Sequence, residues 1–92
     1  MSEPRIVTRE ELLRLCAEVS ILEKIQRNTM RCVIQDSGPS KTIPGGRSII
    51  ASYYEAGYVC TVHRLVARDG QEMHFHVKDA VIHDIRYREE NY

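Results

Sequence analysis

The feature that most constrains the fold is the pair Asp69-Gly70, which stands between two runs of alternating apolar and polar residues. Residues 58–67 and 72–77 both have the period of two that is typical of a half-buried β-strand. An Asp-Gly pair between such runs favours a two-residue turn, because both residues tolerate the positive φ that this turn needs. The sequence therefore predicts an antiparallel hairpin that turns at Asp69-Gly70.

The position of this turn also sets the register of the hairpin. Leu65 then opposes His74 and His63 opposes His76, so these four side chains share one face. The opposite face is the more apolar one, and it holds Val62, Arg64, Val66, Met73, Phe75 and Val77. We expect a helix to cover the apolar face and to leave the histidine-bearing face uncovered.

The rest of the chain after residue 47 extends this hairpin into a meander. Residues 48–55 keep the period of two and precede the first hairpin strand. Residues 78–80 indicate a turn or bulge, and 81–87 a final strand. With a short strand at 30–35 before it, the segment 48–87 predicts an antiparallel β-meander of four to five strands.

A helix is expected at residues 8–28, before the strands. Thr8 and Glu11 have the spacing of a capping box, and Asn28 is a plausible stop. An apolar stripe at helical spacing runs along the segment through Leu12, Leu15, Cys16, Val19 and Leu22. The predicted fold is thus α+β, with one N-terminal amphipathic helix packed on the meander.

Three further segments complete the predicted organisation of a single domain, 1–92. Residues 1–7 are expected to form an arm, and 88–92 a charged tail. Residues 36–47 are glycine- and proline-rich, which predicts a loop that is long for a chain of this size. Loops of that length are often functional, so Lys41 and Arg47 are candidate binding residues.

Composition narrows the range of partners. Thirteen Lys and Arg balance thirteen Asp and Glu, whereas proteins that bind duplex DNA usually carry a basic excess. The three cysteines, Cys16, Cys32 and Cys60, are widely spaced, which favours buried reduced thiols over a zinc-finger framework. The absence of a long apolar run predicts a cytoplasmic protein without membrane contact.

The histidine-bearing face allows three interpretations from sequence. His63, His74 and His76 could bind one zinc ion, since three imidazoles on neighbouring strands are within reach of it. The same histidines could act as acid and base in a small toxin-like ribonuclease, because histidine titrates near neutral pH. Ordinary polar residues on an exposed or partner-covered sheet face are the third interpretation, and no motif spacing favours either of the first two.

The absence of a catalytic motif, together with balanced charge, favours a non-enzymatic binding module that needs no cofactor. We expect it to occupy a protein or a nucleoprotein complex, with contact to single-stranded RNA as a further option. The expected contact residues are Tyr54, His63, Leu65, His74 and His76, with Lys41 and Arg47 from the loop. In size and layout the chain is similar to small inhibitors of phages and mobile elements, such as anti-CRISPR proteins. A homodimer through the uncovered face is equally compatible with the sequence.

Overall fold

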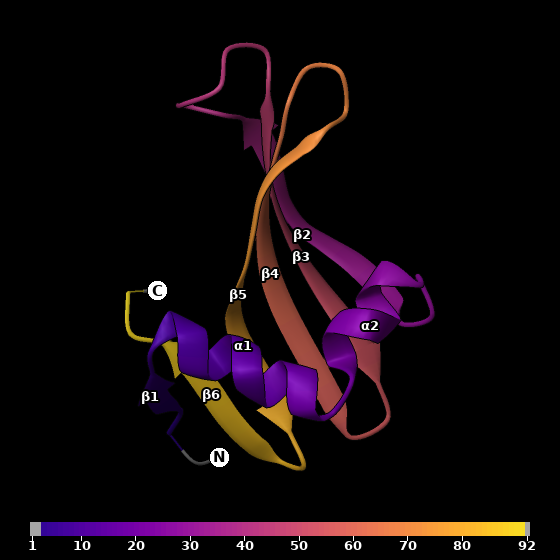
Figure 1. The fold of residues 1–92 in the computed structure, drawn as a ribbon, viewed down its shortest axis with the longest axis vertical. Coiled ribbons are helices and arrows are strands. Elements are labelled where there is room, and N and C mark those ends of the chain that lie inside the picture. The colour runs from indigo at the N-terminus through magenta and orange to yellow at the C-terminus, as the bar shows by residue number, and fades with distance from the viewer. Residues whose placement is uncertain (1–2, 92) are drawn as a thin grey trace.

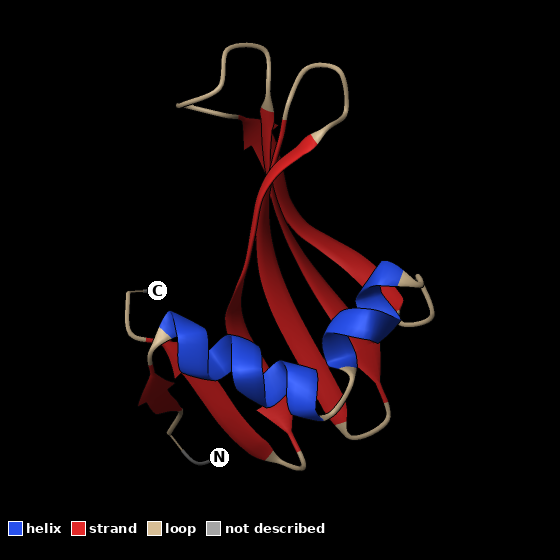
Figure 2. Ribbon diagram, viewed as in Figure 1, coloured by secondary structure: helices blue, strands red, loops and turns tan. Residues whose placement is uncertain are grey.

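The computed structural model describes residues 3–91, which form one six-stranded sheet and two helices. The elements are β1 (Arg5–Val7), α1 (Arg9–Glu18), α2 (Ile21–Gln26), β2 (Arg31–Pro39), β3 (Arg47–Glu55), β4 (Tyr58–Val66), β5 (Glu72–Ile82) and β6 (Ile85–Glu89). The strands lie in the order β1-β6-β5-β4-β3-β2 (Figure 1). Both helices lie on the same face of the sheet and cross only its lower part, so the ends of β2 to β5 extend beyond them (Figure 2).

The α+β class with a mostly antiparallel sheet is confirmed. The predicted one helix and four to five strands are fewer than the two helices and six strands of the structure. The predicted arm 1–7 supplies one missing strand, since Arg5–Val7 pairs in parallel with β6. The Glu90 N–H also donates to the Val7 carbonyl at 2.9 Å. The β-branched residues of β1 suit a strand, but their partner lies at the other end of the chain, where no local pattern points to it. Residues 1 and 2 of the arm lie outside the described residues.

Both ends of the predicted helix 8–28 are found near their expected positions. The Thr8 hydroxyl oxygen accepts the Glu11 N–H at 3.1 Å and so caps α1. Asn28 has a φ of 59°, directly after the last turn of α2. These two residues therefore mark the limits of the helical region as the sequence indicated.

A single continuous helix was nevertheless wrong, because the chain breaks at Ser20. This residue has a left-handed φ of 61°, and its N–H donates to the Ala17 carbonyl at 3.0 Å. The apolar stripe continues across the break, so the spacing of the apolar residues gives no sign of it. The change of direction allows Ile21 and Ile25 of α2 to be buried in the core.

The predicted long loop 36–47 is also wrong, since its first four residues belong to β2 and its last residue begins β3. The connection covers only residues 40–46. Gly38 and Pro39 were interpreted as strand breakers. They are tolerated because β2 is an edge strand, where the lack of a donor or a side chain costs little.

β2 contains a bulge at Gln35. Ile34 pairs with Ala51 and Asp36 pairs with Ile50, so Gln35 is an extra residue without a partner of its own on β3. The bulge reverses the alternation of side chains along β2. It extends the strand beyond residue 35, where the sequence predicted it to end.

The predicted hairpin register is confirmed where it matters for the histidines. His63 pairs with His76, and Leu65 pairs with His74. The turn itself is wider than expected: the Gly70 N–H donates to the Ala67 carbonyl at 2.9 Å, and Gly70 has a φ of 92°. A three-residue loop that ends on a left-handed glycine explains this geometry.

A second bulge follows this turn, at Met73. Leu65 pairs with His74 and Val66 with Glu72, so Met73 has no partner of its own on β4. Its side chain is 54% exposed. The expectation that Met73 faces the helices is therefore wrong, whereas Val62 and Val77 are buried as predicted.

The predicted turn at 78–80 and the separate strand 81–87 are wrong as well. β5 runs through this segment, because Lys78 is the extra residue of a third bulge between the pairs Val62–Val77 and Thr61–Asp79. The chain turns instead at His83-Asp84, where φ is 50° and 68°. Two positive φ values are typical of a type I′ turn. The predicted tail 88–92 begins inside β6, and residue 92 lies outside the described residues.

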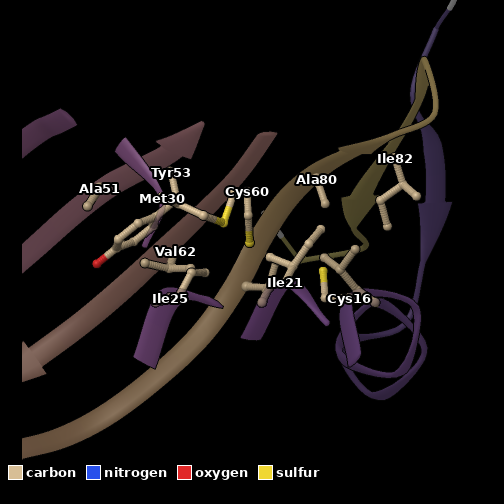
Figure 3. Packing of buried hydrophobic residues seen from close by; sticks show 12 residues of the cluster. Cys16, Ile21, Ile25, Met30, Ala51, Tyr53, Cys60, Val62, Ala80 and Ile82 are labelled. Atoms are coloured by element: carbon tan, nitrogen blue, oxygen red, sulfur yellow. The ribbon is translucent and has the colours of Figure 1, made fainter. Parts of the chain in front are cut away.

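The core lies between the helices and the sheet. Figure 3 shows Cys16 of α1 and Ile21 and Ile25 of α2 pointing toward Cys60 and Val62 of β4. Its buried hydrophobic members are Leu12, Cys16, Ile21, Ile25, Met30, Ala51, Tyr53, Cys60, Val62, Val77, Ala80 and Ile82. A hydrogen bond with Cys16 and burial raise the pKa of the Cys60 thiol. Cys32 is exposed, contrary to the expectation of three buried thiols.

Arg64 is the one charged residue that the predicted pattern placed on the apolar face. Its guanidinium lies over the rings of Tyr53 and Phe75, at 5.5 and 5.2 Å from their centroids. It donates to the Tyr53 hydroxyl and lies 3.5 Å from a Glu72 carboxylate oxygen. These contacts explain how a charge is accommodated there.

Within residues 3–91, no helix is long and apolar enough to cross a membrane.

Candidate functional site

The sheet face opposite the helices, which we call the histidine face, is the main candidate surface. Paired strand residues point to the same side of a sheet, so the register assigns the members of this face. They are Arg31, Val33, Asp36, Gly38, Ser48, Ile50, Ser52, Tyr54, Val59, Thr61, His63, Leu65, His74, His76, Asp79 and Val81. Both helices lie on the other side of the sheet (Figure 2).

The three histidines of this face lie together as the register predicted. His74 Nε2 and His76 Nδ1 are 2.5 Å apart and share a hydrogen bond. The ring centroid of His63 lies 5.2 Å from that of His76 and 6.4 Å from that of His74. The Ser48 hydroxyl lies 2.7 Å from His63 Nε2. The cluster is thus a connected group of imidazoles rather than three separate side chains.

The histidines differ in exposure and in charge. His76 is buried, with 7% of its surface exposed, whereas His63 and His74 are half-buried. Burial, with the positive charges of Arg9 and Lys78, lowers the pKa of His76 to about 4. Burial and Lys78 also lower the pKa of His63. At neutral pH His76 is therefore an uncharged part of the face, and it lies beneath the surface that a partner would contact.

A carboxylate that the sequence analysis placed in the tail holds His76 from the other side. Glu89 is only 1% exposed, and its Oε1 accepts a hydrogen bond from Arg9 Nε at 2.9 Å. Its Oε2 faces His76 Nε2 at 3.8 Å, too far for a direct hydrogen bond. Both of these facing atoms are buried. A charged residue in a charged terminal run gives no signal of burial, so sequence reasoning missed it.

The zinc interpretation finds no support in this geometry. Among residues 3–91, no group of three or more His, Cys, Asp or Glu side chains is placed to hold a metal ion. Two of the nitrogens that zinc would need, His74 Nε2 and His76 Nδ1, are directed at each other instead.

The loop and the histidine face meet in a hollow of about 370 Å³. It is lined by Asp36, Gly38, Pro39, Ser40, Lys41, Thr42, Ser48, His63 and Leu65. The loop is held by its own hydrogen bonds, because the Ser40 hydroxyl accepts the N–H groups of Thr42 and Ile43 at 3.2 and 3.1 Å. Three of the predicted binding residues, Lys41, His63 and Leu65, are thus brought together.

The other predicted binding residues lie elsewhere. Arg47 donates to the Ser37 hydroxyl at 2.8 Å and does not line this hollow. Tyr54 lies toward the other end of β3, with the Arg31 guanidinium 5.7 Å from its ring centroid. Arg31 and Tyr54 line a second hollow, of about 420 Å³. The predicted set therefore divides between two ends of the histidine face.

A third hollow, of about 540 Å³, opens on the helix side. It is lined by Leu13, Leu22, Ile25, Gln26, Arg64, Glu72 and Phe75. No sequence pattern predicts this hollow, because it lies between residues of both helices and residues of β4 and β5. Comparison of the chain with protein-family models, curated proteins and solved structures gave no match.

Proposed function

We propose that the protein is a non-enzymatic binding module that uses the histidine face and the loop 40–46 to occupy a protein or nucleoprotein partner. The observation that carries this proposal is the hollow where Lys41 meets His63 and Leu65 on a sheet face that no described helix covers. A rigid sheet that presents a mixed polar and apolar surface beside a loop is a common arrangement for recognition. A small regulator or inhibitor, of the kind that phages and mobile elements encode, would need no more than this.

The chemistry of the face favours a protein surface, alone or within a nucleoprotein. Polar side chains bond within the face, as Ser52 and Thr61 do at 2.9 Å, so apolar groups such as Leu65 can contact a partner without stranding polar atoms. Lys41 at the rim adds a positive charge, and the Tyr54 ring with the Arg31 guanidinium beside it suits an unstacked RNA base. Single-stranded RNA is therefore the secondary contact in this proposal.

Affinity capture from an extract of the source cell tests the proposal. Lys41→Glu and Tyr54→Ala alter the two ends of the histidine face. Arg14→Glu on α1, whose side chain is 66% exposed, is the matched control on the helix side. We expect the control to retain the partner that the wild type captures, and the two face variants to bind it about tenfold more weakly. Retention by both face variants with loss by the control would contradict the proposal.

The ribonuclease alternative makes a different prediction. A general acid must carry a proton at the working pH, and His76 is neutral and buried near neutral pH. This makes His76 unsuited to act as the acid, and under the binding proposal the purified protein should leave single-stranded RNA intact. Cleavage that disappears when His63 and His76 are both replaced by Gln would replace the binding proposal with the catalytic one.

A further inference from the structure

One edge of the sheet is long and uncovered. β2 is the last strand in the sheet order and has nine residues, whereas the strand at the opposite edge, β1, has three. Most of β2 is exposed, including Cys32, and Ile34 is 60% exposed. An edge strand presents unpaired N–H and C=O groups, so such an edge can accept another strand.

β2 also carries charges that limit which strand can pair with it. Arg31 and Asp36 are five positions apart and would point to opposite sides of a regular strand. The extra residue Gln35 reverses the alternation, so both belong to the histidine face: Arg31 pairs with Tyr54 and Asp36 with Ile50. The edge thus presents a positive and a negative charge on the same side of the sheet.

We propose that β2 is the interface of a symmetric homodimer, in which the edge strands of two copies pair antiparallel about a two-fold axis at Val33. In this register Cys32 opposes the partner's Ile34, and both belong to the helix side of the sheet. Arg31 opposes the bulge of the partner, where Gln35 and Asp36 together face one residue. Each Arg31 therefore meets the partner's Asp36, and the two-fold axis forms this ion pair twice.

Self-complementarity identifies a second copy as the partner. Antiparallel pairing centred on Cys32 or on Ile34 leaves the opposite charges apart, whereas centring on Val33 brings them together. A strand without the same order of charges and the same bulge would place Arg31 or Asp36 opposite an unmatched residue. Charges at a sheet edge usually prevent pairing, and here they select the copy that satisfies them.

The dimer goes beyond the proposed function and gives it a larger surface. Residues directly opposed across an antiparallel pair share a face, so the histidine faces of both copies would lie on the same side of one continuous sheet. The hollow with Lys41 and the neighbouring side chains of Arg31 and Tyr54 would be duplicated on that side. A partner could then contact two copies of each.

Disulfide cross-linking tests the register. In a Cys32→Ser background, Val33→Cys places two thiols on the two-fold axis, where Cα atoms of paired residues are about 4.5–5.5 Å apart, within disulfide range. Ser37→Cys in the same background is the control, because it lies on the same exposed strand but far from the axis. We expect mild oxidation to give a covalent dimer with the first variant only. Equal cross-linking of both, or of neither, would overturn the proposed register.

Charge exchange tests the ion pair. Analytical ultracentrifugation of wild type, Arg31→Glu, Asp36→Arg and the double exchange should show a dimer for wild type. Each single variant should raise the dimer dissociation constant about tenfold or more, because two like-charge pairs replace two ion pairs. The double exchange should restore the dissociation constant of the wild-type dimer. A monomeric wild type at the highest soluble concentration, or a double variant no tighter than the singles, would overturn the dimer.

Discussion

At the scale of single residues, the contact between β5 and the end of β6 decides how the protein responds to pH. Burial, together with the nearby charges of Arg9 and Lys78, lowers the pKa of His76 to about 4, although Glu89 lies opposite it and acts in the other direction. The unfolded chain titrates this imidazole near 6.5. Between these two pH values the unfolded state binds a proton that the native state excludes, so stability falls as the pH falls from 6.5 toward 4.

Urea unfolding at about pH 7 and about pH 4.5 measures this effect. The His76 contribution is fully present above pH 6.5, and lowering the pH should remove up to roughly 3 kcal/mol. His76→Gln lacks the titrating group and should lose correspondingly less over the same interval. Equal losses in wild type and variant would show that other groups control the acid response.

Glu89→Ala should destabilise the fold by about 2 kcal/mol, because it leaves Arg9 without its carboxylate and opens space in a buried site. Glu23→Ala provides the comparison. Glu23 forms an ion pair with Arg27 in which both side chains are exposed. Loss of this ion pair should cost less than about 0.5 kcal/mol. Chemical denaturation of both variants at neutral pH tests the difference, and similar losses would refute a structural role for Glu89.

At the scale of elements, the break between α1 and α2 predicts an unusual effect of glycine. Ser20 has a left-handed φ, so Ser20→Gly relieves strain and should stabilise the protein by about 0.5 kcal/mol. In a continuous helix the same change would cost about 1 kcal/mol. Ala17→Gly, inside α1, should show that cost. Thermal unfolding distinguishes the two, and a loss for Ser20→Gly would argue for an unbroken helix.

The strands differ in how well the sequence predicts their pairing, bulges and turns. The pairing of His63 with His76 was predictable, because alternation and a nearby turn determine it locally. The bulges at Gln35, Met73 and Lys78 were not, since an extra residue leaves the types of its neighbours unchanged. The turn at His83-Asp84 stands between the strand-forming residues Val81, Ile82 and Ile85, which predict an unbroken strand, and Gly38 marks no break because β2 lies at the edge.

The candidate site was predictable to the extent that it depends on one hairpin. His63, Leu65 and His74 lie on the predicted face, and Lys41 joins two of them at the hollow. The burial of His76 depends on residues from both ends of the chain, Arg9 and Glu89. Contacts of that sequence separation are fixed by the complete fold, and no local pattern encodes them.

At the scale of the whole molecule, the sheet order predicts a gradient of local stability. β4 and β5 lie in the middle of the sheet and contribute buried residues to the core, whereas β1 and β2 form its edges. In the monomer, at low protein concentration, amide hydrogen exchange should be slowest in β4 and β5 and fastest in β1 and β2. Protection of β2 that rises with protein concentration would report edge pairing, whereas uniform protection across the sheet would contradict the gradient.

The bulge at Gln35 has a consequence for how this chain can vary. Deleting that one residue would leave Ile34 opposite Ala51 and Asp36 opposite Ile50, now as consecutive pairs of a regular ladder. Arg31 and Val33 would stay on the histidine face, and Cys32 and Ile34 would stay on the helix side. The codon for Gln35 could therefore be lost without altering either surface of the sheet, because the bulge is the one place where β2 carries a residue more than its neighbour.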